Sequence, residues 1–437
     1  MKIVQLTDET RADIQSRLLK RNPANYKEQQ GAVDAILKEI RERGDEALFG
    51  YTEKFDHIRL TRDTIQVTEE EIKEAYDLAD PDLIDVIRKA LVNIRNFHEK
   101  QVRQSWFTET PAGTILGQRV TPLSRVGVYV PGGKAVYPSS VLMNIVPAKV
   151  AGVGEIIMTT PCGRDGKVNP AVLVAANEAG ADRIFKAGGA QAIAAMAYGT
   201  CCIPKVDKIV GPGNIFVALA KRAVYGNVSI DSVAGPSEIL VLADETANPR
   251  FVAADLLSQA EHDELASAVL VTTSRDLAEA VEKEIDGFLK VLGRAEIIKK
   301  SLDQFGFMLI ADTMNDAVDA VNQIASEHLE IVTANPFETM TKVKNAGAIF
   351  LGSYSSEPLG DYFAGPNHIL PTNGTAKFFS PLSVDDFIKK SSVIHYSEEA
   401  LRAVHEDIER FAKCEGLTAH ANSIAVRFED EKPEDMR

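Results

Sequence analysis

Positive charge, cysteine and long apolar runs are all scarce in this chain of 437 residues. The sequence has 48 Lys and Arg against 63 Asp and Glu, which gives a net charge of −15. A balance this acidic lacks the electrostatic footprint of a nucleic-acid-binding protein. No apolar run approaches the roughly 18 residues that a membrane-spanning helix needs. We therefore expect neither a nucleic acid nor a membrane as a partner.

The few cysteines exclude two further classes of protein. Cys162, Cys201, Cys202 and Cys414 form no CxxC pair, and two of them are adjacent. We interpret them as reduced thiols, which excludes a disulfide framework and a cysteine-based zinc site. The segment 1–9 lacks the apolar core of a secretory signal, so we expect a cytoplasmic protein.

The rest of the composition is that of an ordinary globular protein, with 45% hydrophobic and 25% charged residues. The length suits about three domains. Apolar residues from Val33 to Ile40 recur at spacings of three and four up to Gly44, and the segment 83–94 repeats this pattern. These spacings predict that the first hundred residues are helical.

From about residue 120, short apolar runs of β type alternate with helical segments. One series predicts strands at 126–130, 156–159, 184–185 and 209–210, with helices near 139–152 and 169–178 and from 190 and 214. A second series predicts strands at 239–242, 268–272, 307–310, 329–332 and 348–351, with helices at 249–262, 276–290, 314–326 and 337–345. This alternation predicts two α/β domains with parallel sheets and right-handed crossovers.

Two segments lie outside these series. The segment 352–382 is rich in Gly, Pro, Ser and Asn, and we expect one long ordered loop there. Such a loop inside a compact enzyme is more often functional than idle. Residues 397–428 are predicted to be helical again.

Common nucleotide, metal and hydrolase motifs are absent, but three glycine-rich turns follow predicted strands, at 130–133, 187–191 and 211–214. None completes GxGxxG. Each places backbone N–H groups at a strand-to-helix junction, where the helix dipole favours a phosphate. Glycines also make tight turns without any ligand, so a nucleotide or phosphate site and ordinary turns both stay open.

Two pairs of polar residues lie next to predicted helices. Gln259 and His262 are three residues apart and share one helical face, where an amide oxygen and an imidazole nitrogen can ligate a metal. A solvated helix end would look the same. Glu327 and His328 lie between a helix and a strand, and an imidazole beside a carboxylate suits general-base catalysis. A polar turn is the alternative there.

Two more pairs lie towards the C-terminus. Asp361 and His368 lie in the Gly- and Pro-rich loop, and Glu415 and His420 lie in the last helical segment. By themselves, the first pair is compatible with ordinary loop polarity and the second with a surface helix.

Together, these segments resemble the histidinol dehydrogenase family. The likeness runs in order from about residue 25 to 425. Its blocks are 126–135 (VGVYVPGGKA), 186–195 (KAGGAQAIAA), 210–214 (VGPGN), 234–238 (AGPSE), 256–262 (LLSQAEH), 326–330 (SEHLE), 361–372 (DYFAGPNHILPT) and 415–420 (EGLTAH).

The resemblance implies an NAD- and zinc-dependent enzyme that catalyses the last two steps of histidine biosynthesis. It would oxidise L-histidinol to L-histidinal and then to L-histidine, using two NAD+ and one Zn²⁺ per subunit. The implied zinc ligands are Gln259, His262, Asp361 and His420. Two ring nitrogens and two oxygens suit Zn²⁺, although manganese or cobalt could fill the same site.

The resemblance also implies roles in catalysis and substrate binding. His328 would be the base for both oxidations, and Glu327 would activate water. Ser237 and His368 would hold the reacting end of the substrate, and Glu415 would accept a hydrogen bond from its imidazole. The residues implied to bind substrate, directly or through the metal, are Ser237, Gln259, His262, His328, Asp361, His368, Glu415 and His420. Tyr129, Gln191 and Asn214, one on each glycine turn, would contact NAD.

The implied fold is α/β, with two Rossmann-like domains whose nucleotide-binding motifs are incomplete, plus small helical domains formed by the N- and C-terminal segments. Residues 25–128 and 237–382 would form the first α/β domain, and 129–236 the second, NAD-binding one. Residues 1–24 and 383–409 would form a small helical domain. Residues 410–437 would reach the partner subunit of a domain-swapped homodimer, so that Glu415 and His420 enter the partner's active site.

Two other functions stay open. A related zinc- and NAD-dependent dehydrogenase of another small polyol or sulfonated alcohol would not need Glu415, which is present here. A non-redox protein, such as a metal-dependent hydrolase using Glu327 or a nucleotide-binding regulator, is the other alternative. The three glycine turns argue against the hydrolase, and the complete set of metal and base residues argues against the regulator.

Overall fold

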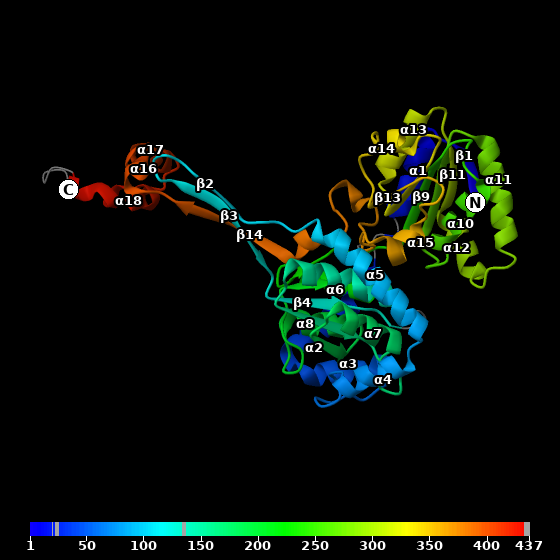
Figure 1. The fold of residues 1–437 in the computed structure, drawn as a ribbon, viewed down its shortest axis with the longest axis horizontal. Coiled ribbons are helices and arrows are strands. Elements are labelled where there is room, and N and C mark those ends of the chain that lie inside the picture. The colour runs from blue at the N-terminus through cyan, green and yellow to red at the C-terminus, as the bar shows by residue number, and fades with distance from the viewer. Residues whose placement is uncertain (20, 22–25, 133–136, 432–437) are drawn as a thin grey trace. The chain divides into compact units, whose positions relative to one another are not determined.

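The structure, a computed structural model, describes residues 1–431 apart from 20, 22–25 and 133–136 (Figure 1). The chain forms two units, Met1–Val102 with Pro122–Phe387 and Arg103–Thr121 with Ile388–Arg437. The larger unit contains two parallel sheets with helices on both faces. This confirms the predicted α/β class. No helix in the described part of the chain is long and apolar enough to cross a bilayer.

The first sheet of the larger unit has six parallel strands in the order β1-β11-β10-β9-β12-β13. The strands are β1 (Lys2–Gln5), β9 (Glu238–Ala243), β10 (Ser267–Thr272), β11 (Gly306–Ile310), β12 (His328–Val332) and β13 (Ala348–Leu351). One face is covered by α10 (Pro249–Ala260), α11 (Arg275–Phe288) and α12 (Ala295–Phe305), and the other by α1 (Asp8–Leu19) and α13 (Met314–Ile324). Both faces are therefore apolar, as expected of a parallel sheet.

The second sheet has five parallel strands in the order β6-β5-β4-β7-β8. They are β4 (Arg125–Tyr129), β5 (Glu155–Thr160), β6 (Arg183–Lys186), β7 (Lys208–Val210) and β8 (Ser229–Ile230). One face is covered by α4 (Glu69–Leu78), α5 (Pro81–Glu99), α6 (Pro138–Ala151) and α7 (Pro170–Ala179). The other is covered by α2 (Lys27–Arg43), α3 (Asp45–Asp56), α8 (Gly189–Tyr198) and α9 (Ile215–Val224).

The packing corrects two of the predicted domain boundaries. Residues 25–128 were expected to join 237–382, but the apolar faces of α2 to α5 pack on the five-stranded sheet, and β4 is one of its strands. Residues 1–24 were expected to join 383–409, but β1 extends the six-stranded sheet and Ile14 of α1 packs against Leu240. A helical stripe shows that one face is buried but not which sheet buries it. Residues 20 and 22–24 of the predicted segment 1–24, and residue 25 of the segment 25–128, lie outside the described residues.

The segment 352–382 is not one continuous loop. It contains the short helix α15 (Glu357–Leu359), the π-type turn η2 (Gly360–Ala364) and the 3₁₀ turn η3 (Thr375–Lys377). The helix α14 (Pro336–Met340) is shorter than predicted, whereas α12 and the turn η4 (Val384–Phe387) were not predicted.

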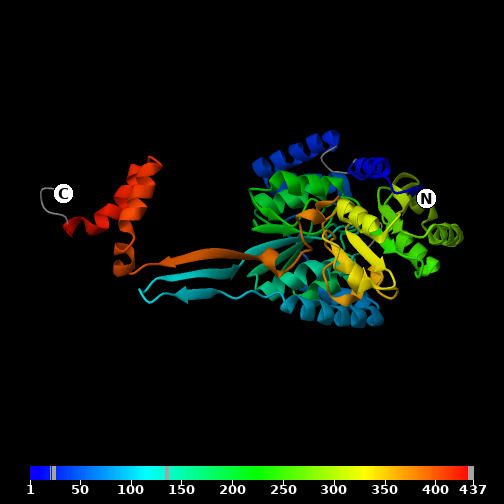
Figure 2. The same ribbon diagram turned by 90° about the horizontal axis from the view of Figure 1, so that it is seen from above.

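The smaller unit has a three-stranded sheet in the order β14-β3-β2, formed by β2 (Trp106–Glu109), β3 (Ile115–Pro122) and β14 (Ile388–His395). It continues into α16 (Glu398–Arg402), α17 (His405–Cys414), α18 (Thr418–Ala425) and η5 (Val426–Glu431) (Figure 2). The helices confirm the prediction for 397–428. Residues 383–409 were predicted to belong to a small helical domain, and the structure adds the strand β14 within them. Residues 432–437 of the predicted C-terminal segment lie outside the described residues.

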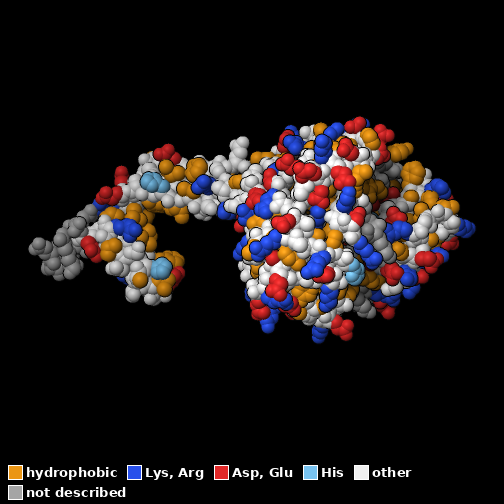
Figure 3. All heavy atoms as spheres, turned by 90° about the horizontal axis from the view of Figure 1, so that it is seen from below, with side chains coloured by type: hydrophobic (Ala, Val, Ile, Leu, Met, Phe, Trp, Pro, Cys, Tyr) orange, Lys and Arg blue, Asp and Glu red, His pale blue; other side chains and the backbone are white. Residues whose placement is uncertain are grey.

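The surface in Figure 3 mixes Lys and Arg with Asp and Glu across the larger unit, with no single-sign region on that face. The smaller unit exposes large apolar side chains, among them Trp106, Phe107, Ile394 and Phe411. Exposed apolar groups of this size are typical of surfaces that contact another protein.

Candidate active site

Glu327 and His328 lie at the amino end of β12, in the six-stranded sheet. Helix α13 ends at Ile324, and the next residue, Ala325, adopts a left-handed conformation with φ of 53° and turns the chain into the strand. Gly347 faces this turn and donates its N–H to the Ser326 carbonyl at 3.0 Å. A Cβ at position 347 would collide with the Glu327 carbonyl oxygen, so only glycine fits there.

Both side chains are buried and electrostatically coupled. Nδ1 of His328 lies 3.7 Å from Oε2 of Glu327. Burial raises the pKa of Glu327 to about 8. Burial alone would lower the pKa of His328, but the neighbouring carboxylates of Glu327 and Asp361 outweigh it and raise that pKa to about 10.

Asp361 and His368 approach the same point from the segment after β13. Nε2 of His328 lies 3.6 Å from Oδ1 of Asp361, and Nδ1 of His368 lies 3.9 Å from that oxygen. His368 is fixed by its Nδ1, 3.0 Å from the Asp361 carbonyl oxygen, and by its Nε2, 3.2 Å from Oγ of Ser140. Burial raises the pKa of Asp361, but the two imidazoles outweigh it and hold that pKa at about 2.

Gln259 and His262 come from the C-terminal end of α10. The amide nitrogen of Gln259 lies 3.1 Å from Nδ1 of His328. Oε1 of Gln259 and Nε2 of His328 are buried and have no hydrogen-bond partner among the described residues. His262 lies in the turn after the helix, where desolvation lowers its pKa while the charge of Asp361 opposes that shift. The structure thus brings together Gln259, His262, Glu327, His328, Asp361 and His368.

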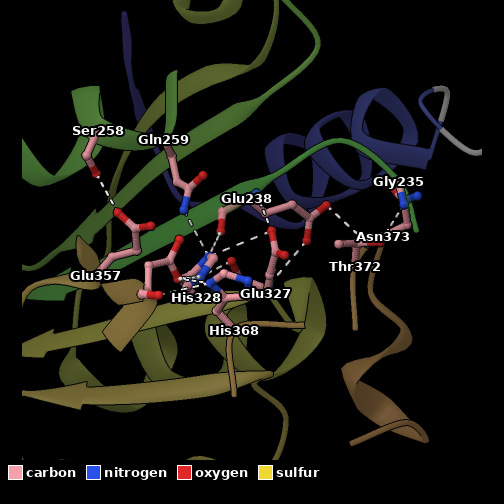
Figure 4. A network of polar contacts seen from close by, with 12 residues as sticks. Gly235, Glu238, Ser258, Gln259, Glu327, His328, Glu357, His368, Thr372 and Asn373 are labelled. Carbon is pink, nitrogen blue, oxygen red and sulfur yellow. Dashed lines mark hydrogen bonds and ion pairs between the residues drawn. The ribbon is translucent and has the colours of Figure 1, made fainter. Parts of the chain in front are cut away.

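Glu357 is a site residue that the sequence interpretation missed. Its carboxylate, a ring nitrogen of His328 and a carboxylate oxygen of Asp361 lie within 4.8 Å of one another, a spacing that could hold a metal ion. Oγ of Ser258 donates to Glu357 at 2.9 Å (Figure 4). Burial and the charge of Asp361 raise its pKa to about 8. Its position four residues before Asp361 in the Gly- and Pro-rich segment was the available signal.

A cavity of about 560 Å³ opens beside these groups and is lined by His328, Phe350, Asp361 and His368, among others. This volume suits a small ligand. Ser237 directly precedes β9, and its carbonyl accepts the N–H of Ser267 at 3.0 Å. The site lies at the amino ends of β9 and β12, whereas ligands in parallel sheets more often lie at the carboxyl ends.

Glu415 and His420 lie in the smaller unit. Glu415 follows α17 and His420 is in α18, and both side chains are exposed. Their contribution to an active site stays a prediction.

Tyr129, Gln191 and Asn214 lie at the carboxyl edge of the five-stranded sheet. Tyr129 is the last residue of β4, and Gln191 and Asn214 follow β6 and β7. The Gly189 N–H donates to the Tyr129 hydroxyl at 3.1 Å, and burial raises the pKa of Tyr129 to about 12. Oδ1 of Asn214 accepts the N–H groups of Phe216 and Val217 and so caps α9.

Two backbone segments, at Gly211 and at Tyr129, approach each other closely at this edge. A Cβ at Gly211 would collide with the Tyr129 carbonyl oxygen, and the φ of Gly211 is 115°. A cavity of about 860 Å³ lies at the same edge, against Pro131 and Pro161. Gly133 of the first predicted turn lies outside the described residues.

The family model of histidinol dehydrogenase matches residues 19–428. The chain belongs to the histidinol dehydrogenase family. A histidinol dehydrogenase of Clostridium acetobutylicum is 58% identical over an alignment of 412 residues, and the match covers 92% of this chain and 95% of the relative. The one from Caldanaerobacter subterraneus subsp. tengcongensis is 55% identical over 428 residues, 98% and 99% of the two chains.

A solved structure agrees with this membership. The crystal structure of histidinol dehydrogenase from Elizabethkingia anophelis matches with a TM-score of 0.88 and 40% identity, over 92% of each chain. The resemblance inferred from the motifs is confirmed, and the protein is an oxidoreductase that acts on CH–OH groups.

Proposed function

We propose that this chain oxidises L-histidinol to L-histidine through L-histidinal, with two NAD+ and one Zn²⁺ per subunit, as the last two steps of histidine biosynthesis. The observation that supports this best is the cluster of the buried Gln259, Glu327 and His328 with the partly exposed Asp361, beside a cavity of small-ligand size. Each NAD+ accepts two electrons as hydride, so two NAD+ account for the conversion of an alcohol to a carboxylate.

The donor set fits a zinc ion. Among the described residues, Oε1 of Gln259 has no hydrogen-bond partner, and a buried acceptor in that state is costly unless another group uses its lone pairs. Gln259, His262 and Asp361 would hold the metal, with His420 as the fourth ligand. When bound, zinc would serve mainly as a template for the amino and imidazole nitrogens of histidinol.

His328 would remove the hydroxyl proton as hydride leaves for NAD+, and would act again in the second oxidation. Its Nδ1 lies 3.0 Å from the Glu238 carbonyl oxygen. If Nδ1–H donates there, Nε2 is the atom with a free lone pair. A cation at Asp361 would offset part of the negative charge that raises the pKa of His328, and so bring that pKa closer to the range of a general base.

Glu327 would take a proton from the water that attacks the aldehyde. A carboxylate with a pKa of about 8 is a stronger base than a solvated one, and it lies beside the imidazole that handles the other proton. Ser237 and His368 would hold the reacting end of the substrate, and Glu415 would accept a hydrogen bond from its imidazole.

Tyr129, Gln191 and Asn214 would contact NAD at the carboxyl edge of the five-stranded sheet, so residues 129–236 would be the NAD-binding part of the larger unit. Backbone N–H groups and helix N-termini at this edge favour a pyrophosphate. Residues 410–437 would reach a partner subunit in a homodimer, which would bring Glu415 and His420 to the partner's site.

The NADH yield from limiting L-histidinol tests this function. Two NADH per histidinol, lost on chelation of metal and restored by zinc, are expected. Absence of NADH from the zinc-loaded protein would overturn the proposal. An aliphatic amino alcohol without an imidazole is the matched control substrate, and equal rates with it would favour the related polyol dehydrogenase.

A further inference from the structure

We propose that Glu238, together with its ion-pair partner Arg21, is a positioning residue that fixes the carboxylate of Glu327 for attack by water. The proposal rests on the function proposed above and adds two residues to it. Glu238 is the first residue of β9, next to the strand that begins at His328.

Glu238 and Glu327 exchange a reciprocal pair of hydrogen bonds. The N–H of Glu238 donates to Oε2 of Glu327 at 2.9 Å, and the N–H of Glu327 donates to Oε2 of Glu238 at 3.3 Å (Figure 4). One bond holds the Glu327 carboxylate, and the other holds its backbone. Oε1 of Glu327 has no hydrogen bond to the described residues, so it is the oxygen available to a water molecule.

Glu238 also contacts His328, the proposed base. The Glu238 carbonyl oxygen lies 3.0 Å from Nδ1 of His328. Glu238 therefore contacts both Glu327 and His328, the latter through its backbone alone. A side-chain substitution at 238 is expected to remove the bond from the backbone N–H of Glu327 and so to shift that residue. The backbone contacts of Glu238 with the Glu327 carboxylate and with His328 stay in place.

Arg21, in the N-terminal segment, holds the carboxylate of Glu238 in place. Its guanidinium pairs with Oε1 of Glu238 and donates to the Leu265 carbonyl at 3.0 Å, and the two charged side chains are 1% and 5% exposed. The N–H of Asn373 donates to the same Oε1 of Glu238 at 3.2 Å.

The two carboxylate oxygens of Glu238 accept hydrogen bonds from three donors: the Arg21 guanidinium and the N–H groups of Asn373 and Glu327. The charge of Glu238 therefore matters for holding Glu327. A carboxylate accepts at both oxygens and turns no donor towards any of the three N–H groups. An amide at position 238 would turn an N–H towards the N–H of Glu327 or towards Arg21, so at least one support would be lost. A buried charge pair also holds the N-terminal segment in place, and the test must separate that structural role from the positioning role.

The experiment compares E238Q with E327Q in the holoenzyme, measuring NADH formation from L-histidinal and the first NADH from L-histidinol separately. We expect E238Q to lose about tenfold or more in the aldehyde step, since a displacement of about 1 Å can cost a hundredfold. Alcohol oxidation should change by about twofold or less, because the backbone contact to His328 remains. E327Q should show the same selectivity.

The matched control is K208M, which removes the ion pair between the buried Lys208 of β7 and the partly exposed Asp386 of η4. It should lower the melting temperature without changing the ratio of the two steps. If E238Q does not fold, R21M/E238L takes its place, because replacement of a buried pair by apolar residues is often tolerated, and the same ratio is measured.

The outcomes separate the two proposals. A wild-type enzyme that makes no NADH from L-histidinol contradicts the proposed function itself. A wild-type enzyme that makes two NADH, with E238Q losing both steps equally or neither, leaves the function standing and overturns the role of Glu238.

Discussion

The amide of Gln259 lies against the imidazole of His328, with 3.1 Å between Nε2 and Nδ1. Oε1 of Gln259 and Nε2 of His328 are both buried and have no hydrogen-bond partner in the part of the chain that the structure describes. Gln259, the candidate metal ligand, and His328, the candidate base, are therefore neighbours, and each would use a different atom. Substituting one residue at a time can separate their two roles.

His328→Ala should lower turnover of L-histidinol by about 10³-fold, the usual range for the loss of a general base, while zinc stays bound. Gln259→Ala should instead lower the zinc content after dialysis against a weak chelator. Metal analysis of both purified variants, alongside NADH assays, checks this. Loss of zinc from His328→Ala would contradict the separation of roles.

Glu327→Gln should spare alcohol oxidation relative to aldehyde oxidation. The amide cannot take a proton from water, whereas His328 still serves the first step. Pre-steady-state NADH formation from L-histidinol and steady-state oxidation of L-histidinal give the two rates. Equal loss in both would refute the role assigned to Glu327.

A mixture of two inactive variants tests whether the smaller unit completes a partner's site. In a domain-swapped dimer, a heterodimer of His328→Ala and His420→Ala subunits has one site with both histidines. Random reassociation should then restore about a quarter of the wild-type activity. Activity that stays at the level of the separate homodimers would show that His420 serves its own subunit or no site.

The four cysteines should differ in reactivity towards iodoacetamide. Cys201 and Cys414 are exposed. Cys202 donates to Oδ2 of Asp45 at 3.3 Å, and desolvation and that carboxylate raise its pKa to about 11. A raised pKa keeps the thiol protonated at pH 8, so Cys202 should react slowly until the pH approaches 11.

Peptide mass spectrometry over a pH series measures this order of labelling. Asp45→Asn should accelerate labelling of Cys202 at pH 8, because the carboxylate no longer opposes the thiolate. Labelling of Cys202 as fast as Cys201 in the unaltered protein would contradict the assignment.

The local patterns of the sequence determined the elements that bury a regular apolar face. Alternating apolar runs predicted β9 to β12 and the helices between them because strands buried on both faces are continuously apolar. Spacing also placed Gln259 and His262 together, and adjacency did the same for Glu327 and His328. The motifs identified the family, but not the contacts around them.

Tertiary structure alone decided where α2 to α5 pack, and which residues hold the site. Strand β14 has little apolar pattern because most of its side chains are exposed, so nothing in its sequence marked it as a strand. Glu238 and Arg21 are 217 residues apart, and Glu357 and Ser258 are 99 apart. A charged side chain is tolerated in the interior when another residue compensates its charge. Because these partners lie so far apart along the chain, only the folded structure shows which residues pair.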